Sequence, residues 1–147
     1  MVYEIQTIDI LNQLGASKKY KGYSYVVSSI LYISEKREPV TLTKTLYVDV
    51  ARKHNTSVSC VEKNIRKVIE NIWENSQNLP LKTEIFGDYQ NSRPSNSDFL
   101  LSLHQYVALR AARELYKEKY PFVCPASGTD CEFCNDFIVD IFSKLIH

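Results

Sequence analysis

A periodic row of branched aliphatic residues in the middle of the chain most limits its fold. These residues recur at the spacing of one face of an α-helix, and polar and charged residues fill the positions between them. The row comprises Val61, Ile65, Val68, Ile69 and Ile72. We therefore predict an amphipathic helix that starts at Ser57 or Ser59, ends near Asn75 and buries this row.

Helical spacing recurs along the rest of the chain, which has only 4 glycines and 5 prolines in 147 residues. In the first expected helix Ile5, Ile8, Leu11 and Leu14 form the apolar side, and Gly15 ends it. The other helices are expected at about 23–34, 42–53, 81–86, 98–120 and 131–146. We predict an all-α protein of six to seven helices, with one domain over 1–106 and a helical extension over 107–147 packed on it.

The expected helices at 42–53 and 57–75 are separated only by the polar turn His54-Asn55-Thr56. Two helices joined by so short a turn, the second of them basic, are typical of a helix-turn-helix of the winged-helix-like or effector-domain type. The second helix of such a pair lies in the major groove of DNA. Trp73, at the end of the apolar row, is expected in the core.

Charge is concentrated in the same region. Between Thr43 and Lys67 there are six basic and two acidic residues, whereas the whole chain has a net charge of only +1. A solvated surface helix would explain this charge equally well, but the helix pair favours DNA as the partner. Ser59, Lys63, Arg66 and Lys67 are predicted to face the groove, and Lys44, Thr56 and Ser57 to contact phosphates.

Glu62 has two competing interpretations. Ser59 and Glu62 have the spacing of a capping box, in which the carboxylate would bond to the start of the helix. Alternatively Glu62 could accept a hydrogen bond from a cytosine amino group. Both roles are compatible if Thr56 or Ser57 caps the helix instead.

Several motifs resemble one known family. They are Leu14-Gly15, Lys21-Gly22-Tyr23, the stretch 42–56, the pattern Ser59-x-Val61-Glu62-Lys63-x-Ile65-Arg66, Phe86-Gly87 and the stretch 94–99. Over roughly residues 11–103 the chain resembles the effector domain of the stage-zero sporulation response regulator of spore-forming bacteria. The resemblance implies a helical domain that binds short DNA sites, often as tandem dimers, and regulates transcription.

The resemblance also implies site residues, with two departures. In the family pattern the recognition helix carries arginines where this chain has Cys60 and Lys63, whereas Glu62 and Arg66 are retained. Lysine is a less selective guanine partner than arginine, and cysteine cannot make that contact, so we expect a different target site. Because about ten residues precede the match, we also expect no phosphate-receiving domain, and regulation by a partner or by the tail.

The tail contains Cys124, Cys131 and Cys134, which with His104 or His147 could hold zinc. A redox or disulfide role is an alternative, but buried or idle thiols are favoured, so we assign no metal and no cofactor. No grouping of catalytic residues stands out, and we expect no enzyme. No signal peptide or apolar run near membrane-spanning length occurs, so a cytoplasmic protein is expected.

These observations predict a sequence-specific regulator of transcription that binds double-stranded DNA as a homodimer, with RNA polymerase as a further candidate partner and no membrane contact. The alternative is a protein-interaction module that kept the fold and antagonises a related regulator by forming heterodimers with it. Cys60 and Lys63 favour this alternative. A zinc-stabilised interaction protein is a third hypothesis, which rests on the tail alone.

Overall fold

The computed structural model describes residues 1–36, 44–75, 78–87 and 92–119. The chain divides into two compact units, Met1–Ala108 and Leu109–His147. All regular structure in the described residues is helical, which confirms the predicted all-α class. None of these helices is long and apolar enough to cross a membrane. The helix expected at 131–146 lies outside the described residues.

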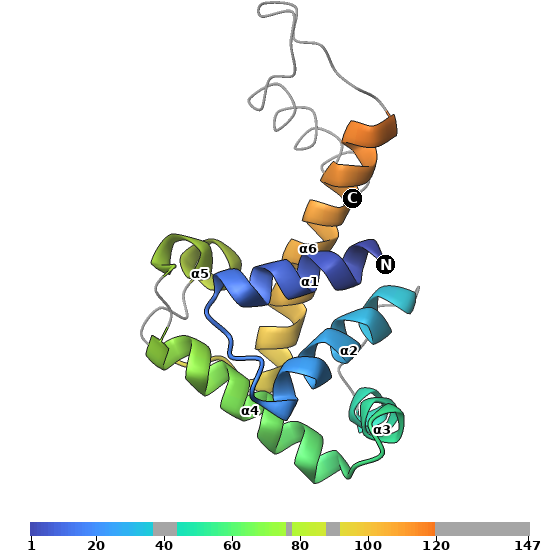
Figure 1. Ribbon diagram of the computed structural model, residues 1–147, viewed down its shortest axis with the longest axis vertical. Helices are drawn as coiled ribbons and strands as arrows, with labels where there is room; N and C mark the ends of the chain where they lie inside the picture. Colours follow the sequence, from blue (N-terminus) through green and yellow to red (C-terminus); the bar gives the residue numbers. More distant parts are fainter. Residues whose placement is uncertain (37–43, 76–77, 88–91, 120–147) are drawn as a thin grey trace, which may run out of the picture. The chain divides into compact units, whose positions relative to one another are not determined.

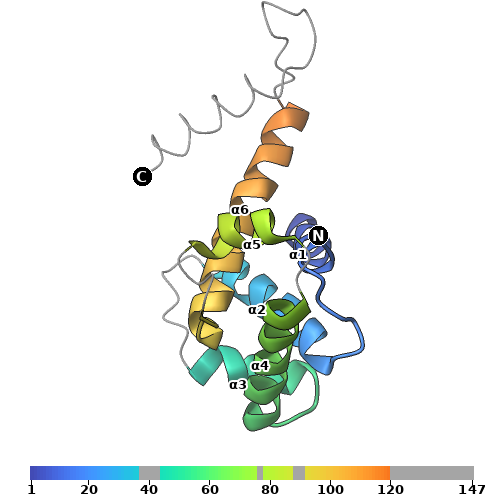
Figure 2. The same ribbon diagram turned by 90° about the vertical axis from the view of Figure 1, so that its left-hand side faces the viewer.

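Figures 1 and 2 show the helices in chain order. They are α1 (Val2–Gln13), α2 (Lys21–Glu35), α3 (Lys44–Lys53), α4 (Val58–Asn75), α5 (Leu79–Phe86) and α6 (Asn96–Lys119). In the first unit α2 lies between α1 and α4, and α3 packs against both α2 and α4. The helix pair α3 and α4 therefore rests on a scaffold made by the N-terminal helices.

Side-chain caps explain where α5 and α6 begin. The Asn78 side chain accepts a hydrogen bond from the amide of Leu81 at 3.2 Å. Pro80 then occupies the first turn of α5, where its missing N–H costs nothing, so the helix begins at Leu79, two residues before the expected start at 81. Before α6, the Ser95 hydroxyl accepts from the amide of Asp98 and donates to its carboxylate. Ser95 therefore caps α6, which begins at Asn96, two residues before the expected start at 98.

The aliphatic row of α4 is completely buried, as its spacing predicted. Each of its five members has no exposed side-chain surface. The prediction for α1 was partly wrong, since Ile5 is 60% exposed whereas Leu11 and Leu14 are fully buried. Steps of three residues drift around a helix that advances about 100° per residue, so Ile5 and Leu14 face opposite sides. Thr7 takes the inward position one turn before Leu11.

Three aromatic rings join α4, α5 and α6. Trp73, Phe86 and Phe99 lie with neighbouring ring centroids 5.1–6.4 Å apart. The ammonium of Lys82 lies 5.2 Å from the centre of the Trp73 ring, so its charge faces the aromatic cloud. Trp73 is half-buried and packs against the core, so the prediction of a core position is confirmed in part.

Helices α2 and α4 approach each other most closely at Gly22. A β-carbon at this position would lie 2.0 Å from the carbonyl oxygen of Asn64 and 2.9 Å from a methyl group of Val68. The first of these neighbours is backbone, which cannot rotate away. Any side chain at position 22 would therefore force the two helices apart.

We predict that Gly22→Ala destabilises the protein by about 1–3 kcal/mol or more, because the added methyl group overlaps a helix backbone. Urea unfolding followed by circular dichroism would measure the loss. Ser24→Ala is the matched control, since Ser24 is exposed on the same helix α2. Its cost should stay within about 0.5 kcal/mol, as is usual for a surface substitution. Equal losses in the two variants would show that the close helix contact is not tightly packed.

Candidate nucleic-acid interface

A tight turn connects α3 to α4. The amides of His54, Asn55 and Thr56 donate to carbonyl oxygens in the last turns of α3, at 3.0, 3.2 and 2.9 Å. Asn55 has a positive φ of 50°, a conformation that asparagine tolerates better than most residues. The chain therefore reverses within a few residues, and α3 and α4 form the predicted helix-turn-helix pair.

His54 fastens this turn to α2. Its Nε2 atom lies 2.8 Å from the hydroxyl of Ser28, and its ring meets the Tyr25 ring edge-on at 4.8 Å. Partial burial lowers the pKa of His54, and the charge of Lys53 acts in the same direction. The neutral imidazole thus holds the turn in place, and its hydrogen bond is directed into the protein.

Ser57 caps α4, and this excludes one interpretation of Glu62. The Ser57 hydroxyl accepts a hydrogen bond from the amide of Cys60 at 3.2 Å, and Ser59 already lies inside the helix. A capping box from Ser59 to Glu62 is therefore not formed. Glu62 is exposed; its backbone carbonyl accepts a hydrogen bond from the Asn96 side chain at 3.1 Å, and its charge helps to raise the pKa of Tyr47, after the larger effect of burial.

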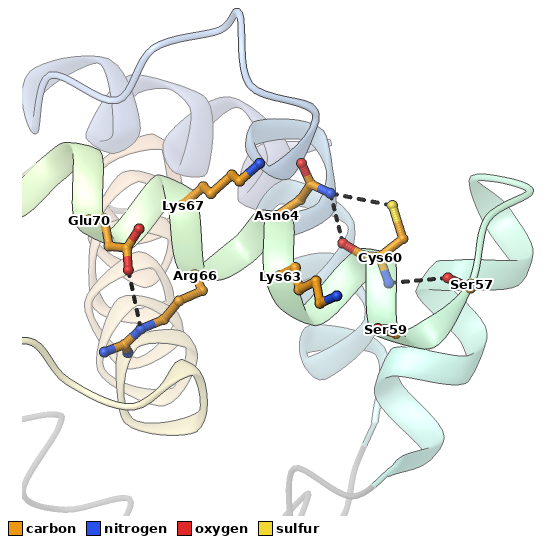
Figure 3. A pocket seen from close by; sticks show the side chains of 8 residues that line it. All are labelled: Ser57, Ser59, Cys60, Lys63, Asn64, Arg66, Lys67 and Glu70. Carbon is orange, nitrogen blue, oxygen red and sulfur yellow. Dashed lines mark hydrogen bonds and ion pairs between the residues drawn. The ribbon is translucent and has the colours of Figure 1, made fainter.

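The outward face of α4 carries an open depression of about 520 Å³, shown in Figure 3. It is lined by Ser57, Ser59, Cys60, Lys63, Asn64, Arg66, Lys67 and Glu70. By helical spacing these side chains form two parallel rows. The outer row is Ser59, Lys63, Arg66 and Glu70, and the inner row is Cys60, Asn64 and Lys67, continued by Asn71.

Six of the nine predicted DNA-contacting residues line this depression: Ser57, Ser59, Cys60, Lys63, Arg66 and Lys67. Thr56 lies in the turn just before it, and Glu62 lies on the helix but outside the depression. Lys44 is the first residue of α3, and its side chain is not among those described. The described residues contain no group of three or more potential metal ligands, and Cys124, Cys131 and Cys134 lie outside them.

Cys60 occupies a polar environment at the start of the inner row. A hydrogen bond from Thr56 lowers its pKa most, against an opposing effect of burial; Tyr25, the charge of Lys21 and Asn64 lower it further. The amide nitrogen of Asn64 lies 3.3 Å from the sulfur. At the position where the resemblance implies an arginine, this chain thus has a thiol whose anion is favoured by its surroundings.

Arg66 is tethered at the opposite edge of the depression. Its Nη1 donates to the carbonyl oxygen of Pro94 at 2.6 Å, and its Nε lies 3.9 Å from the carboxylate of Glu70. Arg93 shares that carboxylate at 3.4 Å and also pairs with Glu74 at 3.1 Å. The segment before α6 is thereby fixed along the outer row.

Sequence reasoning missed part of this interface. Asn64 could have been found by the helical spacing that selected Lys63 and Lys67. The contact between Arg66 and Pro94 joins residues 28 positions apart, and no local pattern announces it. Arg93 and Asn96 were missed for the same reason.

Lys63 and Lys67 leave the depression positively charged. Both side chains are exposed, and neither takes part in an ion pair with another described residue. The acidic residue at this face, Glu70, is occupied by arginines. A helix that leads out of a tight turn and carries two such lysines on its exposed face can bind a polyanion.

The family comparison agrees with this geometry. The family model described as sporulation initiation factor Spo0A C terminal matches residues 7–107, which include the helix-turn-helix and the start of α6. This range is more than two thirds of the chain. The chain therefore belongs to the Spo0A C-terminal family of helical DNA-binding domains that regulate transcription in sporulation.

Proposed function

We propose that the protein is a sequence-specific regulator that binds double-stranded DNA by inserting α4 into the major groove. One observation carries the proposal: α4 buries its whole aliphatic row and turns outward a face on which Lys63 and Lys67 have no ion-pair partner among the described residues. The major groove is about 12 Å wide and admits one α-helix. The open depression on α4 leaves that face accessible.

The side chains divide into two kinds of contact. Arg66, Lys63 and Glu62 have donors or acceptors suited to base edges, whereas Thr56, Ser57 and Lys44 suit phosphates. Ser59 and Lys67 extend the face that meets the groove. Cys60 offers only a thiol, so this protein's preferred site differs from that of relatives with an arginine there.

We further propose that two copies bind paired DNA sites as a homodimer in the bacterial cytoplasm and contact RNA polymerase. Family membership supports DNA binding and transcription control. The competing hypothesis is an antagonist that forms heterodimers with a related regulator, and the Cys60 and Lys63 substitutions favour it. Such an antagonist would select no DNA site of its own.

Selection of duplexes from a random pool, followed by titration across a salt series, tests the function. The logarithm of the association constant should fall linearly with the logarithm of salt concentration, with a slope near −0.9 per phosphate contact. The selected site should bind more tightly than random duplex at every salt concentration. Failure to enrich any site would contradict the regulator and favour the antagonist.

Arg66→Ala should weaken binding to the selected site more than to random duplex, by about 1–3 kcal/mol for a lost bidentate base contact. Lys44→Ala is the contrasting variant, and it should weaken both duplexes alike because phosphate contacts carry no base identity. Fluorescence anisotropy with both duplexes gives the two ratios. Equal losses for Arg66→Ala would mean that this arginine reads no base.

Cys60 offers a direct probe of the docked face. Because its pKa is lowered, its thiolate should react with iodoacetamide at lower pH than free cysteine does. If α4 enters the groove, a saturating selected duplex should slow this alkylation severalfold. Peptide mass spectrometry distinguishes Cys60 from the three tail cysteines, which serve as internal controls. Unchanged alkylation of Cys60 in the complex would contradict docking through this face.

A further inference from the structure

The connection between α1 and α2 runs along the recognition helix. At one end of residues 17–22, the Ser17 amide donates to the Asn71 side chain at 3.0 Å. At the other end, Gly22 lies directly against the carbonyl of Asn64. Asn64 and Asn71 are seven residues apart, about two helical turns, so the connection follows the inner row of α4 over that length. We call residues 17–22 the lysine strap.

The lysine strap carries three exposed cations beside the groove-facing helix. Lys18, Lys19 and Lys21 are exposed, and none forms an ion pair within the described part of the chain. Lys21 is close enough to Cys60 for its charge to lower the pKa of the thiol. Figure 3 shows Lys67 and Asn64 extending from α4 on the side of the α2 ribbon, away from Arg66 and Glu70.

Four lysines thus gather along one edge of α4, with Lys67 between the two anchoring asparagines. The position is fixed, because the contact at Gly22 is between backbone atoms and cannot slide without opening the core. Like charges held together repel one another, and a bound polyanion relieves this repulsion. Lysine ammonium groups are point charges that suit phosphate oxygens and discriminate poorly between bases.

We propose that the lysine strap is a second DNA-contacting surface, which binds the phosphate backbone of one strand while α4 occupies the adjacent major groove. The proposal rests on the proposed function, because it requires α4 to be docked on DNA. Lys18, Lys19 and Lys21 contact phosphates beside the groove, and Lys67 links them to the base-facing side chains. The strap adds affinity and fixes the angle of α4, and it adds no sequence preference.

The experiment compares the full chain with the triple variant Lys18→Gln, Lys19→Gln, Lys21→Gln and with each single variant. Each variant is titrated with the selected duplex and with random duplex at salt concentrations from about 50 to about 300 mM. Over this range the loss of phosphate contacts changes the affinity measurably. The slope should become less steep by about 0.9 for each lysine that contacts phosphate. The ratio of selected to random affinity should stay within about twofold of the wild-type ratio, since phosphate contacts carry no base identity.

Lys36→Gln is the matched control. Lys36 is exposed and follows the last residue of α2, roughly 22 Å from Lys21 along the helix, about twice the Debye length at 0.1 M salt. Its replacement removes the same charge but should leave the slope unchanged. Thermal unfolding of every variant establishes whether the fold is retained. If the triple variant unfolds, the single variants test the proposal, because a single substitution at an exposed lysine should leave the fold intact.

A second measurement locates the contact. Duplexes that each carry one uncharged methylphosphonate identify the phosphates whose charge the wild type uses. At least one such position should weaken wild-type binding severalfold and have no effect on the triple variant.

The outcomes separate the two proposals. A wild-type protein without salt-dependent DNA binding would overturn the proposed function, and the strap proposal with it. If the wild type binds but the folded triple variant keeps the wild-type slope, the strap proposal alone is wrong. A loss confined to the selected duplex would also overturn it, because the lysines would then be reading bases.

Discussion

The close packing of α2 on α4 at Gly22 is the constraint on which the rest of the structure depends. A glycine faces a helix carbonyl, so two backbones meet with no side chain between them. This contact sets the depth at which α4 sits on the scaffold, and it leaves the opposite face of α4 open. It also places the strap beside the inner row. The exposure of the cationic face of α4 therefore depends on Gly22 in α2.

Regular spacing made most of the fold predictable. The buried row of α4 and the serine cap of α6 follow from local patterns that each lie within a few turns. The errors have equally local causes. Ile5 belonged to a three-residue repeat that does not stay on one helical face. The start of α5 was expected after Pro80, although the first turn of a helix accepts proline. The approach of α2 to α4 is a contact between distant segments, and a lone glycine in a helix gives no sign of its neighbour.

In the candidate site, as in the fold, the features set by local sequence were predictable and the contacts between distant segments were not. Spacing alone assigned Lys63, Arg66 and Lys67 to one face, because a helix converts sequence position into direction. Spacing could not decide the role of Glu62, since that role depended on whether Ser57 or Ser59 caps α4. Helical spacing could not predict the contacts that Pro94 and the lysine strap make with α4, because these residues come from distant parts of the sequence. The local sequence determines which side chains share one face of a helix. Tertiary packing determines which other segments lie beside that face.

The two edges of α4 differ in how free their charges are, and this difference bears on how the interface would discriminate between DNA sites. Arg66 already donates to Pro94, a charge-assisted hydrogen bond worth about 1.5–3 kcal/mol, which is comparable to a bidentate base contact. Exchanging the hydrogen bond to Pro94 for a base contact would gain little free energy. Arg66 would therefore select a base mainly if its remaining Nη donors reach that base while the hydrogen bond to Pro94 persists. Its exposed pair with Glu70 costs at most about 1 kcal/mol to break. The strap lysines and Lys67 on the inner edge form no ion pair with any residue that the structure describes. Under the proposed docking, affinity would come from the edge that carries the strap lysines and Lys67, and selectivity would depend on the tethered arginine.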